Sequence, residues 1–248
     1  IDLVMDRTFA GTLLLLSLFA AFGKYVKIEE PMGWQQAQEH CRTQYTDLAP
    51  ISSYRDIARL QILAEDGNIF YWIGMRRGSE DIGKWSWSGG GEVSRHFWAE
   101  GQPDNGTQET YAAFYQGQVH DVTERDIAVF CYRVVVVREK MTWEDALDHC
   151  EEHHSNLASV ASETEMMLIQ RELGKITTTE HVWIGLRFIP GGWQWVDQQQ
   201  LDYEAWSQDK KPTCPHLSVQ CGALKAVGRP ESDKRFKCEE VKRKKKNK

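Results

Sequence analysis

The sequence predicts an α+β fold, built as two tandem domains of similar size within a chain of 248 residues. The segment Met32–Cys41 reads Met-Gly-Trp-x-x-Ala-x-x-His-Cys, and Met141–Cys150 repeats this pattern with threonine in the second position. The offset of about 109 residues is far longer than the period of solenoid repeats and indicates whole domains. Three further landmarks recur in the same order at nearly the same offset: Tyr71–Gly74 as Val182–Gly185, Trp85-x-Trp87 as Trp193-x-Trp195, and Trp98 as Trp206.

Each repeat begins with a β-rich stretch, Tyr25–Ile28 in the first and Val134–Val137 in the second. An amphipathic helix follows, because apolar residues recur at helical spacing along one face. In the second repeat this face is formed by Trp143, Ala146, Leu147 and Cys150. The cysteine that ends the motif therefore lies on the buried face, where it can pin the helix to another part of its domain.

A second helix is expected over Tyr54–Ala64 and over Glu163–Leu173, with Ser53 and Ser162 as N-caps. Short strands and glycine-rich turns account for the rest of each repeat, and the Trp-x-Trp motif places both indoles on one face of a strand. The chain has ten tryptophans. Because most of them recur at matched positions, they are expected in the core, in particular Trp72, Trp85, Trp183 and Trp193.

Residues 1–23 are expected to lie outside the fold. The apolar run Phe9–Phe22 follows a positive charge and is too short for a membrane-spanning helix, which favours a secretory signal peptide over a buried helix. Small residues in Ala21–Gly23 place the mature start near Lys24, and Ile1–Val4 precede the expected initiator. No other segment reaches a transmembrane length, so the prediction is a secreted, extracellular protein.

The predicted domains span residues 24–132 and 133–241, followed by a basic tail at 242–248. The boundary follows Cys131 without a Pro/Gly linker, which indicates domains packed with limited freedom. A net charge of −6 argues against general affinity for nucleic acid. Six cysteines, an even number in an exported chain, predict a disulfide framework.

These motifs resemble those of the C-type lectin-like domain. The shared elements are a helix that ends in a cysteine, Trp-Ile-Gly, Trp-x-Trp, a tryptophan before a long loop and, in the first repeat, the terminal strand Ile127–Cys131. The match spans Tyr25–Tyr132 and Tyr132–Cys238. The sequence is similar to those of the tandem C-type lectins of fish and of mannose-receptor and selectin modules. The resemblance implies two helices that flank small antiparallel sheets, with a long loop region that carries the ligand site.

The resemblance also implies the disulfide Cys41–Cys131, which closes a long loop and stabilises by roughly 4 kcal/mol in the chain-entropy model. The family's inner disulfide is missing from the first repeat, since Tyr111 stands where its first cysteine would be. Two interpretations of the second repeat stay open. An intact domain pairs Cys150 with Cys238 and Cys214 with Cys221. A truncated domain has lost its last strand, pairs Cys221 with Cys238, and leaves Cys150 and Cys214 unpaired. We favour this interpretation because the residues around Cys238 are charged.

In sugar-binding members, a Glu-Pro-Asn or Gln-Pro-Asp loop, a following acid and a Trp-Asn-Asp strand hold calcium, which takes six to eight oxygen ligands. The first repeat has the galactose-type sequence Gln102-Pro103-Asp104, and the resemblance implies a sugar and Ca²⁺ site at Gln102, Asp104, Glu109, His120 and Asp121. His120 stands where the family motif has an asparagine, whose amide oxygen is a metal ligand, so four side-chain metal ligands remain. The alternative is a loop that no longer binds calcium.

Asn105 begins an N-glycosylation sequon inside this loop, so a glycan there would crowd a sugar ligand; the alternative is an unused sequon. In the second repeat Lys211-Pro212-Thr213 replaces the loop motif, and no calcium is expected at that position.

His149-x-x-Glu152-His153 fits a zinc-peptidase pattern, but it lies on the repeated cysteine helix and is better explained as exposed helical residues. We therefore expect no enzyme. The expected function is binding of glycans or glycoproteins, weakly assisted by Ca²⁺ through the first domain. The alternative is a calcium-independent protein–protein interaction module whose sugar sites are lost.

Overall fold

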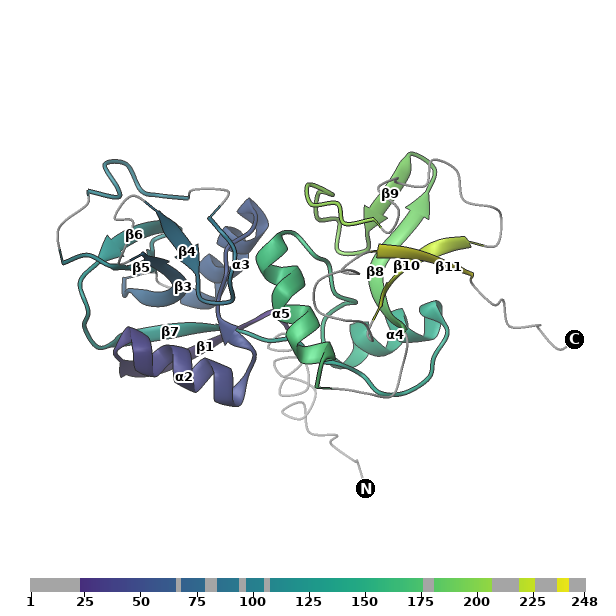
Figure 1. Ribbon diagram of the computed structural model, residues 1–248, viewed down its shortest axis with the longest axis horizontal. Helices are drawn as coiled ribbons and strands as arrows, with labels where there is room; N and C mark the ends of the chain where they lie inside the picture. Colours follow the sequence, from purple (N-terminus) through teal and green to yellow (C-terminus); the bar gives the residue numbers. More distant parts are fainter. Residues whose placement is uncertain are drawn as a thin grey trace, which may run out of the picture.

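The computed structural model describes residues 23–65, 68–78, 84–93, 97–104, 108–175, 181–206, 219–225 and 236–240. These residues form two α+β domains that lie side by side, with helix α5 of the second domain between the two sheets (Figure 1). None of the described helices combines the length and apolar character that a membrane span requires. The predicted signal peptide and basic tail lie outside the described residues, except for Gly23.

The first domain is built on one sheet in the order β1-β7-β3-β5-β6, with β2 paired to β7 and β4 paired to β3. Strand β7 is central: it pairs antiparallel with β1 and parallel with β3. Its last five residues are all buried, at most 5% exposed. The strands are β1 (Tyr25–Met32), β2 (Asp47–Leu48), β3 (Tyr71–Arg77), β4 (Trp85–Trp87), β5 (Tyr111–Tyr115), β6 (Gln118–Val122) and β7 (Ile127–Tyr132).

Two helices flank this sheet, α2 (Trp34–Gln44) and α3 (Tyr54–Ala64). Helix α3 begins where the sequence predicts, because the Ser53 hydroxyl accepts a hydrogen bond from the Asp56 N–H and the Asp56 carboxylate bonds back to the Ser53 N–H. Helix α2 buries Cys41, which forms the expected disulfide with Cys131 of β7 across a Cα–Cα distance of 5.4 Å.

The second domain repeats this plan in part. Its elements are α4 (Trp143–His153), α5 (Glu163–Leu173), β8 (His181–Ile189), β9 (Gly192–Trp195), β10 (Val219–Lys225) and β11 (Phe236–Glu240). Helix α5 has the predicted bounds, and the Ser162 hydroxyl caps it by accepting from the Glu165 N–H. The sheet runs β11-β10-β8-β9.

The strand register shows which elements of the two domains correspond. Trp72 of β3 faces Ala113 of β5, and Trp183 of β8 faces Ala223 of β10. Strands β8, β10 and β11 are therefore the counterparts of β3, β5 and β6. Among the described residues, the second domain has no counterpart of the central strand β7.

The expected strand at Val134–Val137 is wrong: the structure gives these residues no strand. Four consecutive valines have high β propensity, but a strand also needs a neighbour for its backbone hydrogen bonds. The corresponding strand of the first domain, β1, pairs with β7 alone, and the described residues offer the valines no such partner.

The paired tryptophans make the same buried hydrogen bonds in each domain. The indole N–H of Trp34 donates to the Ile73 carbonyl and that of Trp143 to the Ile184 carbonyl, both at 2.9 Å. Of the four core tryptophans predicted from the sequence, Trp72, Trp85 and Trp193 are buried. Trp183 is only half-buried, because no described strand covers it as β7 covers Trp72.

Neither cysteine pairing considered for the second domain is formed. Cys150 and Cys221 are buried free thiols, and each pairing requires at least one of them. Cys221 corresponds in register to Tyr111, and it packs with Trp143 in the core. Gly222, rather than Cys221, lies opposite Cys238 in the β10–β11 ladder. Cys214 lies outside the described residues.

The two domains are joined by a buried ionic cluster at equivalent positions of the repeat. The ammonium of Lys24 lies 2.8 Å from Asp56 of α3 and 2.7 Å from Glu165 of α5, and both carboxylates are fully buried. Burial lowers the pKa of Lys24, but the charges of Asp56 and Glu165 outweigh burial and raise it. Lys24 therefore forms ion pairs with the acid in the first turn of α3 and with the equivalent acid of α5.

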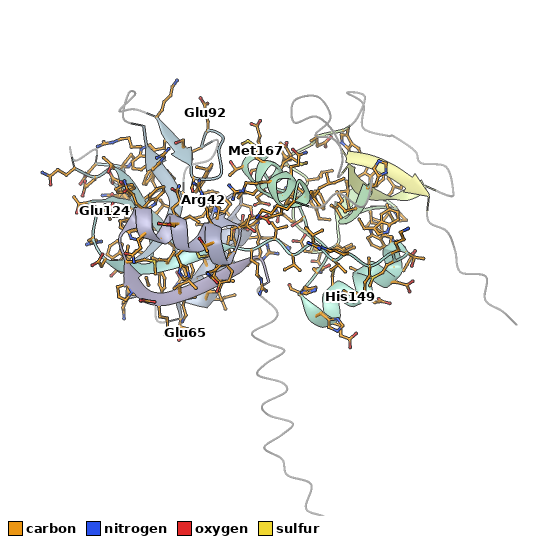
Figure 2. The ribbon with its side chains drawn as sticks, turned by 60° about the horizontal axis from the view of Figure 1, so that its bottom comes forward. Arg42, Glu65, Glu92, Glu124, His149 and Met167 are labelled. Carbon is orange, nitrogen blue, oxygen red and sulfur yellow. A yellow bond between two sulfur atoms is a disulfide. The ribbon has the colours of Figure 1, made fainter. Side chains whose placement is uncertain are left out.

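Helix α5 also packs against the glycine turn that follows β4. Gly91 has φ +86°, and a Cβ there would lie 2.9 Å from the Thr164 hydroxyl of α5. The Thr164 hydroxyl donates to the Gly90 carbonyl at 2.9 Å. Met167, labelled in Figure 2 on α5, is close enough to contact a side chain at either glycine. The glycines of this turn thus permit close contact between the domains.

Candidate functional site

The loop that leads into β5 brings the predicted site residues of the first domain to one end of the β5–β6 hairpin. Backbone hydrogen bonds hold this loop to β6: the Ala99 N–H donates to the Val119 carbonyl, and the Val119 N–H donates to the Phe97 carbonyl, both at 2.9 Å. The hairpin register places Asp121 opposite Ala112. The loop and the strand therefore present their acidic side chains at the same place.

Three of the predicted residues come together as a carboxylate group. Oxygen atoms of Asp104, Glu109 and Asp121 all lie within 4.8 Å of one another. Asp104 is exposed, Glu109 is half-buried and Asp121 is buried. Hard oxygen donors of negative charge at this spacing are the ligands that Ca²⁺ prefers.

Gln102 lies beside this group. Its side-chain oxygen accepts a hydrogen bond from the Asp121 N–H at 3.2 Å, and the Asp104 N–H donates to the Asp121 carboxylate at 3.3 Å. The Gln102–Pro103 peptide bond is cis. An amide oxygen has two lone pairs, so Gln102 can accept this hydrogen bond and still offer an oxygen to a cation.

His120 is not part of the carboxylate group. Its ring packs edge-on against Phe70 and Tyr115, with centroid distances of 5.8 and 5.7 Å. Burial lowers the pKa of His120, and the nearby Asp121 carboxylate opposes this shift. Successive residues of a strand point to opposite faces, so the sequence already contained the signal that separates His120 from Asp121.

The aromatic cluster around His120 was not predicted from the sequence. Phe70 and Tyr115 stack with centroids 4.3 Å apart, and the Arg125 guanidinium lies 4.5 Å from the Phe70 centroid. Phe70 precedes β3 and Arg125 precedes β7, so only the sheet topology brings them together.

The zinc-peptidase pattern on α4 gives no metal site among the described residues. The rings of His149 and His153 stack at 4.6 Å, but the only described group of three or more ligand atoms at metal spacing is that of Asp104, Glu109 and Asp121. Asn105 and the Lys211–Thr213 loop lie outside the described residues.

Comparison with known proteins identifies the family. The model of the lectin C-type domain matches residues 30–131 and again residues 139–244. C-type mannose receptor 2 of Rattus norvegicus is 23% identical over 227 residues, which cover 74% of this chain but only 15% of the receptor. L-selectin of Mus musculus is 36% identical over 81 residues, 31% of this chain and 21% of the selectin. The solved mouse scavenger receptor C-type lectin carbohydrate-recognition domain is 25% identical with a TM-score of 0.40, over 44% of this chain and 90% of that one. Because the two matches of the family model cover most of the chain, the chain belongs to the C-type lectin family, a family of carbohydrate-binding modules without enzymatic activity, and carries two copies of its domain.

Proposed function

We propose that the first domain binds glycans or glycoproteins outside the cell, with a Ca²⁺ ion held by Gln102, Asp104, Glu109 and Asp121. The observation that carries this proposal is the convergence of three carboxylates within 4.8 Å beside the Gln102 side-chain oxygen. A bound Ca²⁺ would offset the repulsion among the carboxylates and leave coordination positions for two vicinal sugar hydroxyls.

The metal site is weak, because one side-chain oxygen is missing. His120 stands where an amide would supply it, and its ring packs against Phe70 and Tyr115. With fewer oxygen ligands, Ca²⁺ affinity falls to the extracellular range, with a Kd on the order of 10⁻⁴ to 10⁻³ M. Such a site is occupied only where calcium is abundant.

Galactose-type sugars are the expected ligands, because the loop reads Gln102-Pro103-Asp104. The amide and the carboxylate fix which sugar hydroxyls meet donors and acceptors around the metal. A glycan on Asn105, the next residue, would crowd this site, so sugar affinity should be higher for the unglycosylated chain.

Calcium titration by calorimetry tests the metal site. Replacing Glu109 with glutamine is expected to weaken Ca²⁺ binding about ten-fold or more, because the site loses one of its three converging carboxylates. Glu92→Gln is the matched control, because Glu92 is an exposed carboxylate of the same domain outside this group, and it should leave binding unchanged. No heat from the wild type, or equal affinities for the wild type and Glu109→Gln, would contradict the site and favour the calcium-independent interaction module.

A further inference from the structure

A polar pocket of about 310 Å³ lies at the junction of the two domains, where the glycine turn after β4 meets the N-terminus of α5. The residues that line it include Ser52, Trp87 and Glu92 of the first domain and Ser162, Glu163 and Thr164 of the second. Glu92 and Met167 of α5, both labelled in Figure 2, lie on the two sides of this junction. The carboxylate group of Asp104, Glu109 and Asp121 does not line the pocket, so the pocket is separate from the proposed calcium site.

Hydrogen bonds between the domains fix the buried side of the pocket, where Ser52 and Thr164 lie. The hydroxyls of Ser52 and Ser162 are 2.8 Å apart, and the Ser162 hydroxyl also accepts from the Glu165 N–H at 3.2 Å. The Thr164 hydroxyl donates to the Gly90 carbonyl at 2.9 Å. The pocket is therefore built from the interface itself, and its shape depends on how the two domains pack.

Two carboxylates at this pocket have no partner. Glu92 and Glu163 are exposed, and within the described chain neither side chain forms a hydrogen bond or an ion pair. By contrast, the buried acids Asp56 and Glu165 share the Lys24 ammonium. Two unpaired negative charges at one pocket attract a cation.

The surrounding charges keep the pocket negative. The Ser52 N–H donates to the Asp56 carboxylate at 3.0 Å, so the buried ionic cluster begins directly behind Ser52. Its members are the cations Lys24 and Arg59 and the acids Asp56, Glu165 and Asp197. The N-termini of α3 and α5 add partial positive charge here, but the acids of the cluster outnumber its cations and offset this charge. The charges of Glu92 and Glu163 are therefore not cancelled by their surroundings.

Trp87 supplies a hydrogen-bond donor to the same pocket. The indole N–H groups of Trp34, Trp72 and Trp143 each donate to a backbone carbonyl, whereas no described residue accepts a hydrogen bond from the indole of Trp87. Only 7% of Trp87 is exposed, yet its N–H is not one of the buried polar atoms without a partner. Solvent therefore reaches this N–H, and Trp87 lines the pocket. A ligand that satisfies the N–H must carry an oxygen acceptor beside its positive charge.

We propose that this pocket binds a protonated amino sugar, and that it does so without calcium. The ammonium group donates to Glu92 and Glu163, and a sugar oxygen accepts from the Trp87 N–H. The hydroxyls of Ser52 and Ser162 keep lone pairs for the sugar hydroxyls. The volume is at the small end of the range for small-molecule sites, which suits one sugar residue. A neutral sugar lacks the charge that the carboxylates require, so this site goes beyond the calcium-assisted binding proposed above.

Calorimetry of the full chain with glucosamine tests this site. The titration is done in a chelator and at mildly acidic pH, where the amine of glucosamine is protonated. N-acetylglucosamine is the matched neutral sugar, and its affinity is expected to be lower by about ten-fold or more, because it loses charge-assisted hydrogen bonds. Since the chelator empties the calcium site, this titration and the calcium titration can fail independently.

Substitutions at the pocket should show which groups bind the amino sugar. Glu163→Gln is expected to lower the affinity for glucosamine about ten-fold, because a carboxylate becomes a neutral amide. Trp87→Phe removes the N–H, keeps an aromatic ring in the core, and should lower the affinity several-fold. Glu151→Gln is the matched control, because Glu151 is an exposed carboxylate on α4 outside the pocket. Circular dichroism checks the fold of each variant, and the exposed position of Glu163 keeps the test valid if Trp87→Phe does not fold.

Three results would overturn the proposal. The first is equal affinity of the wild-type chain for glucosamine and N-acetylglucosamine, or no heat with either. The second is an unchanged affinity of Glu163→Gln for glucosamine. The third is tighter binding of lysine amide than of glucosamine, which would assign the pocket to a basic side chain of a protein partner.

Discussion

Replacing Lys24 with methionine is expected to lower the free energy of unfolding by about 3 to 5 kcal/mol, the usual cost of breaking a buried ion pair. Methionine keeps much of the apolar stem, but it leaves the fully buried carboxylates of Asp56 and Glu165 without their shared cation. The interface between the domains should loosen, and chemical denaturation should show two transitions in place of one. Adding Glu165→Gln to this variant should restore part of the loss.

Lys27→Met is the matched control. Lys27 is as shielded as Lys24, but its partners Glu29 and Glu65 are 76% and 69% exposed, so the expected loss is below about 1 kcal/mol. Equal losses for the two variants would contradict a special role for the Lys24 cluster.

The same cluster sets how stability depends on pH. Burial raises the pKa of Asp56, but Lys24, through charge and a hydrogen bond, together with Arg59, outweighs burial and holds the pKa below its ordinary value. Because the pKa of Asp56 is lower in the folded than in the unfolded state, its contribution to stability is present above the unfolded-state pKa. That contribution is lost as the pH falls through the folded-state pKa. Stability should therefore decline below about pH 4, and less steeply for Asp56→Asn. The raised pKa of Lys24 predicts a second loss in the alkaline range, above about pH 10.4.

Removal of the Cys41–Cys131 disulfide by a double alanine substitution is expected to cost about 4 to 5 kcal/mol in the chain-entropy model, because the bond closes a long loop. Both cysteines are fully buried, so lost packing adds to this cost. Denaturation of the first domain without reductant measures the effect. Cys150→Ala, which removes a buried but unbonded thiol, should cost far less. A loss below 1 kcal/mol for the double variant would show that the disulfide does not limit stability.

Local signals in the sequence predicted much of each domain. The bounds of α3 and α5 were correct because Ser53 and Ser162 cap their own helices through hydrogen bonds three residues along the chain. Trp72, Trp85 and Trp193 were correctly assigned to the core from their recurrence at matched positions.

Features that depend on distant partners could not be predicted. Val134–Val137 have strong strand propensity, but a strand forms only where another backbone lies beside it. The sequence indicated only that the mature chain begins near Lys24. It gave no sign of the ion pair between Lys24 and Glu165, which lie 141 residues apart. The position of His120 was predictable in part, since alternation along β6 separates it from Asp121, but its contact with Phe70 depends on the sheet order.

The measurement that tests the proposed function most directly is retention on immobilised galactose with and without calcium. The wild-type chain should be retained in millimolar Ca²⁺, released by a chelator, and bound less well by immobilised mannose. Asp104→Asn should abolish retention, because the metal loses a charged ligand. Glu124→Gln is the control and should leave retention unchanged, because this carboxylate lies outside the group of Asp104, Glu109 and Asp121. Retention that persists in the chelator, or that is equal for Asp104→Asn and wild type, would contradict calcium-assisted sugar binding by the first domain.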